Sequence, residues 1–278
     1  MEHQEGFFKG VRDAQIYYQA WLPASGPKAV LIVVHGLGEH SGRYANVVNQ
    51  VVPLGYAVYG LDHLGHGRSE GTRVYVDSFS DYTKTLDTFV SMVKEWQPGK
   101  PCFMLGHSMG GLITSTYLLD HQERLDGAIL SGPAVKVGDS VSKLTITLGQ
   151  ILSTVVPKAG LVQLEATAVS RDPAVVEAYL TDPLVHTGKT TARLAAELVK
   201  SMQRVTAQSA EIDLPLLLLQ GGKDTLVDPS GAQMLYDTVS SPDKTLHVYP
   251  ELYHEVHNEP EKAQVLSDLT AWLEAHTA

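Results

Sequence analysis

Short runs of apolar and β-branched residues recur along this chain, and most are separated by longer segments with a helical pattern. Because most runs are apolar throughout, they indicate strands buried on both faces. Alternation of this kind predicts an α/β fold, with a mostly parallel sheet covered by helices on both faces. The first two runs have no helix between them, which predicts an antiparallel edge at the start. The expected strands lie at 15–22, 28–35, 56–62, 101–107, 126–132, 214–221 and 245–250, and the expected helices at about 43–53, 78–96, 109–121, 230–239 and 260–275.

The alternation stops once, from Ala134 to Gln208. No buried strand is expected there, while 142–157 and 190–205 have the pattern of amphipathic helices. An insertion between two core strands most simply forms a helical cap over the carboxyl ends of the strands, where ligands bind in such sheets. The expected parts of the chain are therefore a first core segment, 1–133, a cap, 134–208, and a second core segment, 209–278.

Composition limits the partners and the compartment. With 278 residues, 44% of them hydrophobic, the chain is long enough for one large soluble domain. Its net charge of −10 argues against nucleic acid as a partner, because binding to phosphates needs a positive surface. The single cysteine, Cys102, fits a reducing compartment. The opening segment MEHQEGFFKG lacks the features of a signal peptide, and no apolar run reaches the roughly 18 residues that span a bilayer. We therefore expect a cytoplasmic protein with no obligate protein partner.

The segment GHSMG, Gly106–Gly110, has the G-x-S-x-G pattern with Ser108 at its centre. An expected strand precedes it and a helix-compatible run follows it, which is the setting of a nucleophile elbow. The alternative is that Ser108 is only the N-cap of a glycine-rich helix. The choice depends on partners elsewhere in the chain, because a serine hydroxyl needs a base, and the base needs a third group to fix its tautomer.

Acid and base candidates follow the last two expected strands. Asp224 comes directly after one strand and its glycine turn, whereas Asp228 precedes a proline and is typical of a helix N-cap. His254 lies in the short loop after the last strand, and His257 stands nearer the final helix. The order acid, then histidine, after the serine is that of the α/β-hydrolase arrangement. We therefore predict Ser108 as nucleophile, His254 as base and Asp224 as acid, with His257 as a neighbouring pocket or structural residue.

The segment 33–44, VVHGLGEHSGRY, runs from a strand into a glycine-rich turn of the kind that brings backbone N–H groups close to an anion. It lacks the Gly-Lys-Ser/Thr ending of a phosphate-binding loop. A metal site is the alternative, because His35, His40, His63 and His66 gather in two loops. Their spacing differs from that of zinc-ligand sets such as H-E-x-x-H. We expect neither a metal nor a cofactor, and we predict the transient oxyanion of an ester under attack as the anion.

Together, these motifs resemble those of the monoacylglycerol lipases and related lysophospholipase-like serine hydrolases of the α/β-hydrolase superfamily. The resemblance implies an eight-stranded α/β-hydrolase sheet with a helical cap inserted after the sixth strand. HGLGEHSGRY and DHLGHGRSEG are the segments most particular to this group, whereas GHSMGG is common to many α/β-hydrolases. The matching segments, which extend from residue 35 to 260, are HGLGEHSGRY, LDHLGHGRSEG, LGHSMGG, LLLLQGGKDTLVD and YHEVHNEPE.

The resemblance also implies roles for individual residues. Ser108, Asp224 and His254 would form the catalytic triad, and the backbone N–H groups of Leu37 and Met109 would form the oxyanion hole. These two positions fit the usual oxyanion hole of the fold. One backbone N–H belongs to the residue after the nucleophile, and the other belongs to the loop after a neighbouring core strand.

Four further positions match family residues that bind the glycerol end of the substrate. They are Glu39, Arg43 and His257, with Tyr179 from the cap. The alternative is that Glu39 and Arg43 form a salt bridge that keeps the oxyanion turn in shape. Leu37 is bulkier than the alanine common in animal members, so the resemblance predicts a differently shaped pocket at the ester.

These residues and the resemblance predict an enzyme that hydrolyses monoacylglycerols to fatty acid and glycerol, with a small lipid ester as its partner. The alternatives are a broad carboxylesterase or lysophospholipase, a peptidase, and a catalytically silent binding protein of the same fold. The apolar segment 144–156 of the cap is expected either to touch lipid aggregates or a membrane surface, or to pack against its own neighbours.

Overall fold

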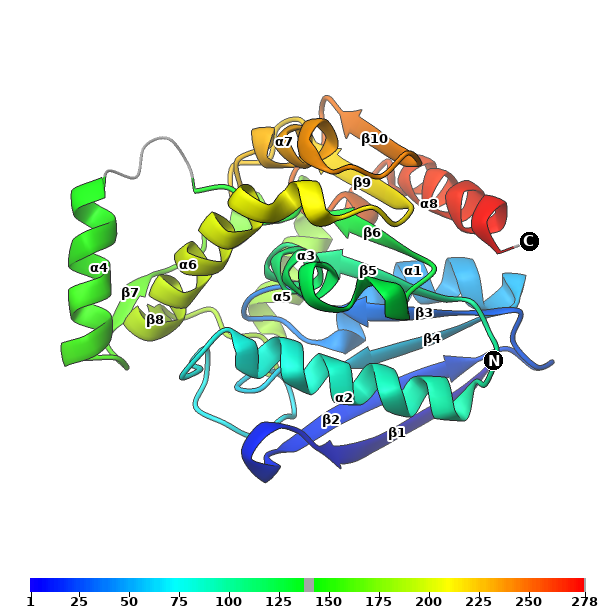
Figure 1. Ribbon diagram of the computed structural model, residues 1–278, viewed down its shortest axis with the longest axis horizontal. Helices are drawn as coiled ribbons and strands as arrows, with labels where there is room; N and C mark the ends of the chain where they lie inside the picture. The colour runs from blue at the N-terminus through cyan, green and yellow to red at the C-terminus, as the bar shows by residue number, and fades with distance from the viewer. Residues whose placement is uncertain (138–142, 278) are drawn as a thin grey trace.

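The computed structural model describes residues 1–137 and 143–277. Within these residues, one sheet of eight strands forms the core, in the order β1-β2-β4-β3-β5-β6-β9-β10 (Figure 1). β1 and β2 pair antiparallel and β2 is antiparallel to β4, whereas the remaining pairs are parallel, so the predicted mostly parallel sheet is confirmed. The strands are β1 (Glu2–Lys9), β2 (Gln15–Leu22), β3 (Ala29–Val34), β4 (Tyr56–Leu61), β5 (Cys102–His107), β6 (Gly127–Ser131), β9 (Leu216–Gly221) and β10 (Lys244–Tyr249).

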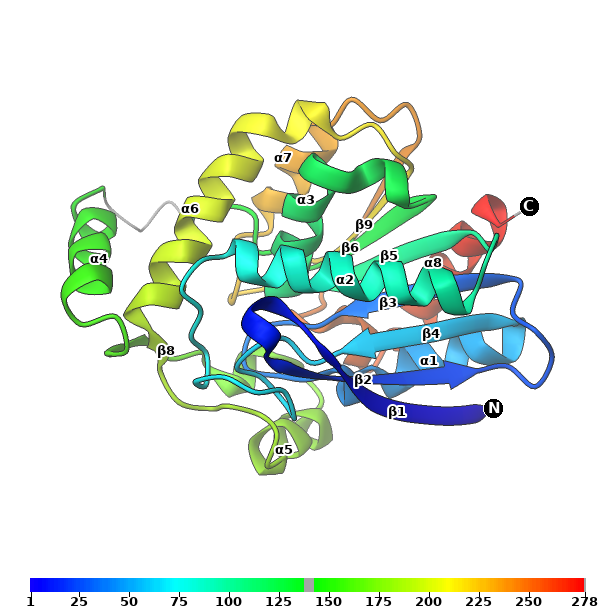
Figure 2. The ribbon, with the colours of Figure 1, turned by 60° about the horizontal axis from the view of Figure 1, so that its bottom comes forward.

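Helices cover both faces of this sheet because its central strands are apolar on both sides. In β3, Val30 and Ile32 belong to the core on one face, and Leu31 and Val33 to the core on the other. Residues of α2, α3 and α7 complete the first core, and residues of α1 and α8 complete the second (Figure 2). These helices are α1 (Ala45–Val51), α2 (Ser80–Trp96), α3 (Met109–His121), α7 (Ser230–Thr238) and α8 (Lys262–His276). Short 3-10 turns lie at Val11–Asp13, Ser41–Tyr44, Val52–Leu54, Gln122–Arg124, Ala166–Ala168, Ser209–Glu211 and Val256–Asn258.

The antiparallel edge at the start of the chain contains a strand that the sequence does not predict. β1 pairs along its whole length with β2, but Phe8 is its buried residue and most of its other side chains are exposed. An edge strand with solvent on both sides has no apolar alternation to mark it. β2 and β3 are not neighbours, because β4 lies between them.

After β6 the chain leaves the sheet and returns to it at β9, and the described elements between these two strands are called the cap. Apart from the antiparallel β2, the strands point toward the side of the molecule where α4 and α6 lie, so these cap helices lie at their carboxyl ends (Figure 1). The two predicted cap helices are present, and α5 with the two-stranded sheet β7–β8 is an addition to them. No helix in the described ranges is long and apolar enough to cross a bilayer. The cap elements are α4 (Lys143–Val155), β7 (Gly160–Val162), α5 (Pro173–Thr181), β8 (Thr190–Thr191) and α6 (Ala192–Gln208).

Candidate active site

Ser108 occupies a strained turn between β5 and α3. Its φ of 54° and ψ of −120° lie in a region that non-glycine residues rarely adopt. The flanking glycines are required by space. A Cβ on Gly106 would lie 2.5 Å from the carbonyl oxygen of Gly110, and a Cβ on Gly110 would lie 1.9 Å from that of Val34. Only glycine at both positions allows α3 to pack this closely against β3 and to place Ser108 in the turn between β5 and α3.

Asp224 and His254 meet at the ends of neighbouring strands, β9 and β10. The Nδ1 of His254 donates a hydrogen bond of 2.7 Å to Oδ2 of Asp224. The other carboxylate oxygen, Oδ1, accepts the backbone N–H groups of Leu226 and Val227 at 2.9 and 3.1 Å. Burial alone would raise the pKa of Asp224, but the attraction of His254 and these hydrogen bonds outweigh it and lower the pKa. Asp224 is therefore an ionised acceptor that fixes the tautomer of His254.

The same contact also changes the pKa of His254. Burial by itself disfavours the imidazolium form of His254, but the Asp224 carboxylate outweighs burial and raises the pKa of His254 above its ordinary value. Asp228 makes no such contact. It accepts hydrogen bonds from the backbone N–H and hydroxyl of Ser230, in the first turn of α7, and pairs with Lys136 at 3.1 Å. Its geometry is that of a helix-start residue.

The two residues with candidate oxyanion donors lie on either side of Ser108. Met109 is the first residue of α3, and Leu37 lies in the loop after β3. That loop touches the nucleophile, because a Cβ on Gly36 would lie 3.1 Å from Cβ of Ser108. Leu37, Ser108, Met109, Asp224 and His254 all line one cavity.

This cavity has a volume of about 720 Å³, within the range of small-molecule sites. Core and cap both contribute to its wall, which is mostly apolar. The core side includes Leu226 and Val227. The cap side includes Leu161, Leu164, Leu198, Val199 and Met202. The arrangement can therefore enclose an apolar chain next to a serine, a histidine and main-chain donors.

Glu39 and Arg43 belong to a buried ion-pair network beside this cavity. Glu39 accepts hydrogen bonds from the Gly36 backbone at 2.6 Å, the Tyr44 hydroxyl at 2.8 Å and Arg43 at 2.7 Å. Arg43 also binds both carboxylate oxygens of Glu255, at 2.7 and 2.9 Å. The network therefore ties the turn at 36–43 to the residue directly after His254.

The other two glycerol-end candidates adjoin the same network. The ring of Tyr179 lies 4.7 Å from the Arg43 guanidinium, and Tyr179 lines a smaller cavity of about 340 Å³ that also borders Leu37. His257 is buried and stacks on Tyr44 with ring centroids 5.2 Å apart. The structure thus brings all four candidates to one side of the oxyanion loop, but none of them lines the larger cavity.

Two acidic residues of this region are not predicted by the sequence analysis. Glu255 pairs with Arg43, as above. Glu259 is fully buried and accepts hydrogen bonds from Ser170, Arg171 and the Tyr253 backbone, so it fastens the loop that carries His254 to the cap. Their sequence signal is weak, because acids in a loop before a helix are typical of solvated surface.

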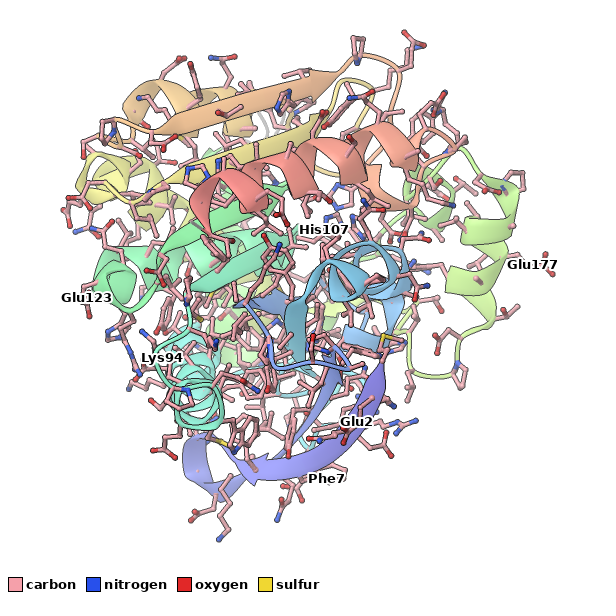
Figure 3. All side chains as sticks on the ribbon, turned by 90° about the vertical axis from the view of Figure 1, so that its right-hand side faces the viewer. Glu2, Phe7, Lys94, His107, Glu123 and Glu177 are labelled. Atoms are coloured by element: carbon pink, nitrogen blue, oxygen red, sulfur yellow. The ribbon has the colours of Figure 1, made fainter. Side chains whose placement is uncertain are left out.

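His107 extends the polar cluster beneath the triad. Its Nδ1 donates to the Ser131 carbonyl at 2.9 Å, and its ring lies 4.7 Å from that of His254 and 5.1 Å from that of His257. Figure 3 shows His107 in the interior, whereas the labelled Lys94 and Glu123 lie at the periphery. Burial lowers the pKa of His107 to about 4, so its ring is neutral near pH 7.

The histidines considered as metal ligands make other contacts. His40 binds Asp182 at 2.9 Å, His63 donates to the His35 carbonyl, and His66 donates to the Leu64 carbonyl. Among the residues that the structure covers, no group of three or more His, Cys, Asp or Glu side chains could hold a metal ion.

Comparisons with known proteins place the chain in a family. Residues 25–261 match the family model described as serine aminopeptidase, S33. The monoacylglycerol lipase of Mycolicibacterium smegmatis is 41% identical over 272 residues, which are 98% of this chain and 97% of that protein. The human monoglyceride lipase is 33% identical over 266 residues, covering 95% and 88% of the two chains.

Solved structures of monoacylglycerol and monoglyceride lipases are also similar to this chain. The monoacylglycerol lipase of Paleococcus ferrophilus has a TM-score of 0.83 at 28% identity, covering 99% of this chain and 100% of that chain. A soluble variant of the Saccharomyces cerevisiae monoglyceride lipase, in complex with a substrate analogue, has a TM-score of 0.87 at 23% identity, covering 100% and 96%, and shares the fold. The chain therefore belongs to this serine hydrolase family of the α/β-hydrolase fold, together with the monoacylglycerol lipases that it resembles.

Proposed function

We propose that this chain is a serine hydrolase that cleaves monoacylglycerols into a fatty acid and glycerol. The observation that carries the proposal is the single cavity that joins Ser108, the His254–Asp224 pair and the Leu37 loop to a mostly apolar wall. Relatives named monoacylglycerol lipase or monoglyceride lipase, which match nearly the whole chain, support this substrate class.

The reaction begins with attack by Oγ of Ser108 on the ester carbonyl carbon. Nε2 of His254 takes the hydroxyl proton, and the Asp224 carboxylate stabilises the imidazolium that forms. The backbone N–H groups of Leu37 and Met109 stabilise the tetrahedral oxyanion. His254 then gives its proton to the glycerol oxygen, and the C–O bond breaks to leave an acyl group on Ser108. Water, activated by His254, releases the fatty acid by the same steps.

The cap, residues 134–208, supplies the binding site for the acyl chain. Its residues 138–142 lie outside the described ranges. Leu161, Leu198 and Met202 face the cavity that contains Ser108. Burial of an acyl chain against them contributes about 0.8 kcal/mol per CH₂ group. Acyl specificity is therefore a property of the cap, and bond cleavage a property of the core.

The charges in the larger cavity favour an ester over a peptide with a free amino terminus. An aminopeptidase needs a carboxylate that is free to bind the substrate ammonium. In the described part of the cavity wall, Asp224 is bound to His254 and Asp228 to Lys136. The nearby Glu39 and Glu255 are both paired with Arg43.

The contacts of the glycerol-end candidates favour a supporting role for three of them. Glu39 and His257 are buried behind the proposed oxyanion turn, and the Arg43 side chain, which pairs with Glu39, is 10% exposed. Tyr179 lines the smaller cavity beside Leu37, and we assign it the direct contact with the polar end of the substrate.

The outer face of the cap supports contact with lipid aggregates or a membrane surface. Leu148, Ile151 and Val155 of α4 are 52%, 54% and 72% exposed, and Val162 of β7 is 55% exposed. Leu148, Ile151 and Val155 are spaced three and four residues apart, so they share one face of α4, and an exposed apolar helix face of this kind fits docking at a lipid surface. This contact would deliver substrate from the aggregate to the cavity.

A fluorophosphonate probe and a substrate panel test the proposal. The probe is expected to form one covalent adduct on Ser108 of the folded protein and none on Ser108→Ala. Monoacylglycerols are expected to be hydrolysed faster than diacylglycerols, triacylglycerols, lysophospholipids and short p-nitrophenyl esters. Absence of the adduct would favour a non-catalytic binding protein. Equal rates on monoacylglycerols and lysophospholipids or diacylglycerols would favour a broad esterase or lysophospholipase with the same mechanism.

A further inference from the structure

The oxyanion donor of the β3 loop is one end of a single peptide group. The N–H of Leu37 and the C=O of Gly36 belong to the same planar peptide, so they point in opposite directions. The direction of the N–H is therefore set by whatever holds the Gly36 oxygen. In this structure, that oxygen lies 2.8 Å from Nδ1 of His35.

We propose that His35 is a positioning residue for the oxyanion hole, a role that rests on the proposed function of Leu37 as a donor to the oxyanion. His35 is the last residue before the glycine-rich turn and is fully buried beneath it. It is not expected to touch the substrate. It acts through the Gly36–Leu37 peptide.

The tautomer of His35 follows from its second contact. Nε2 of His35 lies 2.9 Å from the backbone nitrogen of His63, and a backbone N–H can only donate. Nε2 must therefore accept, and the ring proton of the neutral imidazole must be on Nδ1. Nδ1–H then donates to the Gly36 oxygen. The backbone of the loop after β4 thus selects the tautomer that holds the oxyanion peptide.

The groups on either side of this peptide are held in the same way. Nε2 of His63 lies 3.2 Å from the His35 carbonyl and donates to it, and the Gly36 N–H donates to Glu39 at 2.6 Å. Three successive backbone groups before Leu37 are thus bound by side chains. Within the residues that the structure describes, the Leu37 N–H itself has no acceptor, which leaves it available to the substrate.

The hydrogen bond to Gly36 has an electronic consequence as well as a geometric one. A donor on the oxygen of an amide polarises the group and makes its N–H a stronger donor. Burial, together with the nearby His63 and His66 rings, lowers the pKa of His35 well below its ordinary value. The imidazole therefore stays neutral near pH 7 and keeps both the donor and the acceptor that the arrangement needs.

The first test observes the tautomer in the unmodified protein. A long-range proton–nitrogen NMR correlation on nitrogen-labelled protein, with the His35 ring assigned through its backbone, reports which ring nitrogen carries hydrogen. We expect a neutral ring with hydrogen on Nδ1 near pH 7. A ring with hydrogen on Nε2, or a doubly protonated ring, would overturn the proposal.

The second test compares two ring replacements in the same buried cluster. His35→Phe removes the donor to Gly36 but keeps an aromatic ring beside His63, whose ring lies 4.1 Å away. His66→Phe is the matched control, because its ring lies in the same cluster, 5.5 Å from His35, but bonds to Leu64 instead of the oxyanion turn. Both variants are compared at equal folded protein, measured by near-UV circular dichroism.

His35→Phe should lower kcat for a p-nitrophenyl ester by about 10–100-fold, below the roughly 10²–10³-fold that follows loss of a donor outright. Inhibition by a trifluoromethyl ketone, which forms a tetrahedral oxyanion on the serine, should weaken by a similar factor, with KM nearly unchanged. His66→Phe should leave both kcat and the inhibition constant close to those of the unmodified protein. Equal effects in the two variants, or a change in KM alone, would contradict the proposal. If Ser108 is not the nucleophile, the unmodified protein itself fails to react with a fluorophosphonate, so the two failures are distinguishable.

Discussion

The hydrogen bond of 2.7 Å from Nδ1 of His254 to Oδ2 of Asp224 joins the ends of two neighbouring parallel strands, and both residues are buried. It fixes one tautomer of His254 and leaves Nε2 as the nitrogen that can take a proton. This relationship gives the sharpest test of which acid serves the base.

Asp224→Asn should lower kcat by about 10³–10⁴-fold, because an amide no longer stabilises the imidazolium and permits the wrong tautomer. Steady-state kinetics on a p-nitrophenyl ester would measure the loss. Asp228→Asn is the control, and it should keep kcat within about 3-fold of the unmodified protein, since Asp228 bonds to Ser230 and Lys136 instead of His254. The reverse ranking of the two variants would reassign the acid.

The acid limb of the pH profile should lie above pH 6.5. Asp224 raises the pKa of His254, and only the neutral ring can take the proton of Ser108, so activity is lost as pH falls through this raised pKa. A profile of kcat/KM against pH measures the midpoint. Asp224→Asn should move the midpoint to lower pH, because it removes the charge that favours the imidazolium. A midpoint below pH 6 in the unmodified protein would contradict a contact between Asp224 and His254 that raises the pKa of the ring.

Arg43→Met should destabilise the fold by about 3–5 kcal/mol, because it leaves the buried Glu39 and Glu255 carboxylates without a positive charge beside them. Denaturant unfolding measures the change. The matched control is Arg204→Met, whose partner Asp120 is half-exposed, and it should cost about 1 kcal/mol or less. If Arg43 instead serves mainly to bind glycerol, the variant would keep its stability and show a raised KM for monoacylglycerols only.

N-ethylmaleimide should leave the native protein active. Cys102 is 1% exposed, and burial raises the pKa of its thiol to about 12, so both access and thiolate are lacking. Residual activity and intact mass, followed over time, measure the reaction. The same reagent should label Cys102 fully after unfolding in guanidinium, which confirms that the thiol itself is reactive. Rapid inactivation of native protein would contradict the burial.

Local physical requirements explain which parts of the fold the sequence predicts. β3 and β5 are buried on both faces, so their composition alone marks them as central strands. A Cβ on Gly106 or Gly110 would lie less than 3 Å from a neighbouring backbone oxygen, so the turn needs glycine at both positions. The G-x-S-x-G pattern therefore predicts the turn around Ser108. β1 escapes prediction because its pairing with β2 depends on backbone groups and its side chains face solvent.

The buried charges are a clearer example of what the sequence alone does not predict. Glu255 and Glu259 are acidic residues in a loop, and their sequence context is that of a solvated surface. Each becomes interior only because a distant segment supplies cations or donors: the 3-10 turn Ser41–Tyr44 supplies Arg43, and the cap supplies Ser170 and Arg171. Such pairings depend on contacts between segments far apart in the chain, so composition, periodicity and short motifs do not predict them. The same holds for the His35–His63 contact between two loops.

The close approach of Gly110 to Val34 also bears on how such an enzyme can change through evolution or engineering. A methyl group at Gly110 would meet the Val34 backbone at 1.9 Å, so a residue with a side chain at this position would push α3 away from β3. The relative position of Ser108 and the Leu37 loop therefore depends on this one approach, whereas the cap residues that line the larger cavity are ordinary side chains. New substrate ranges should arise through exchanges at Leu161, Leu198 or Met202 and leave the chemistry intact.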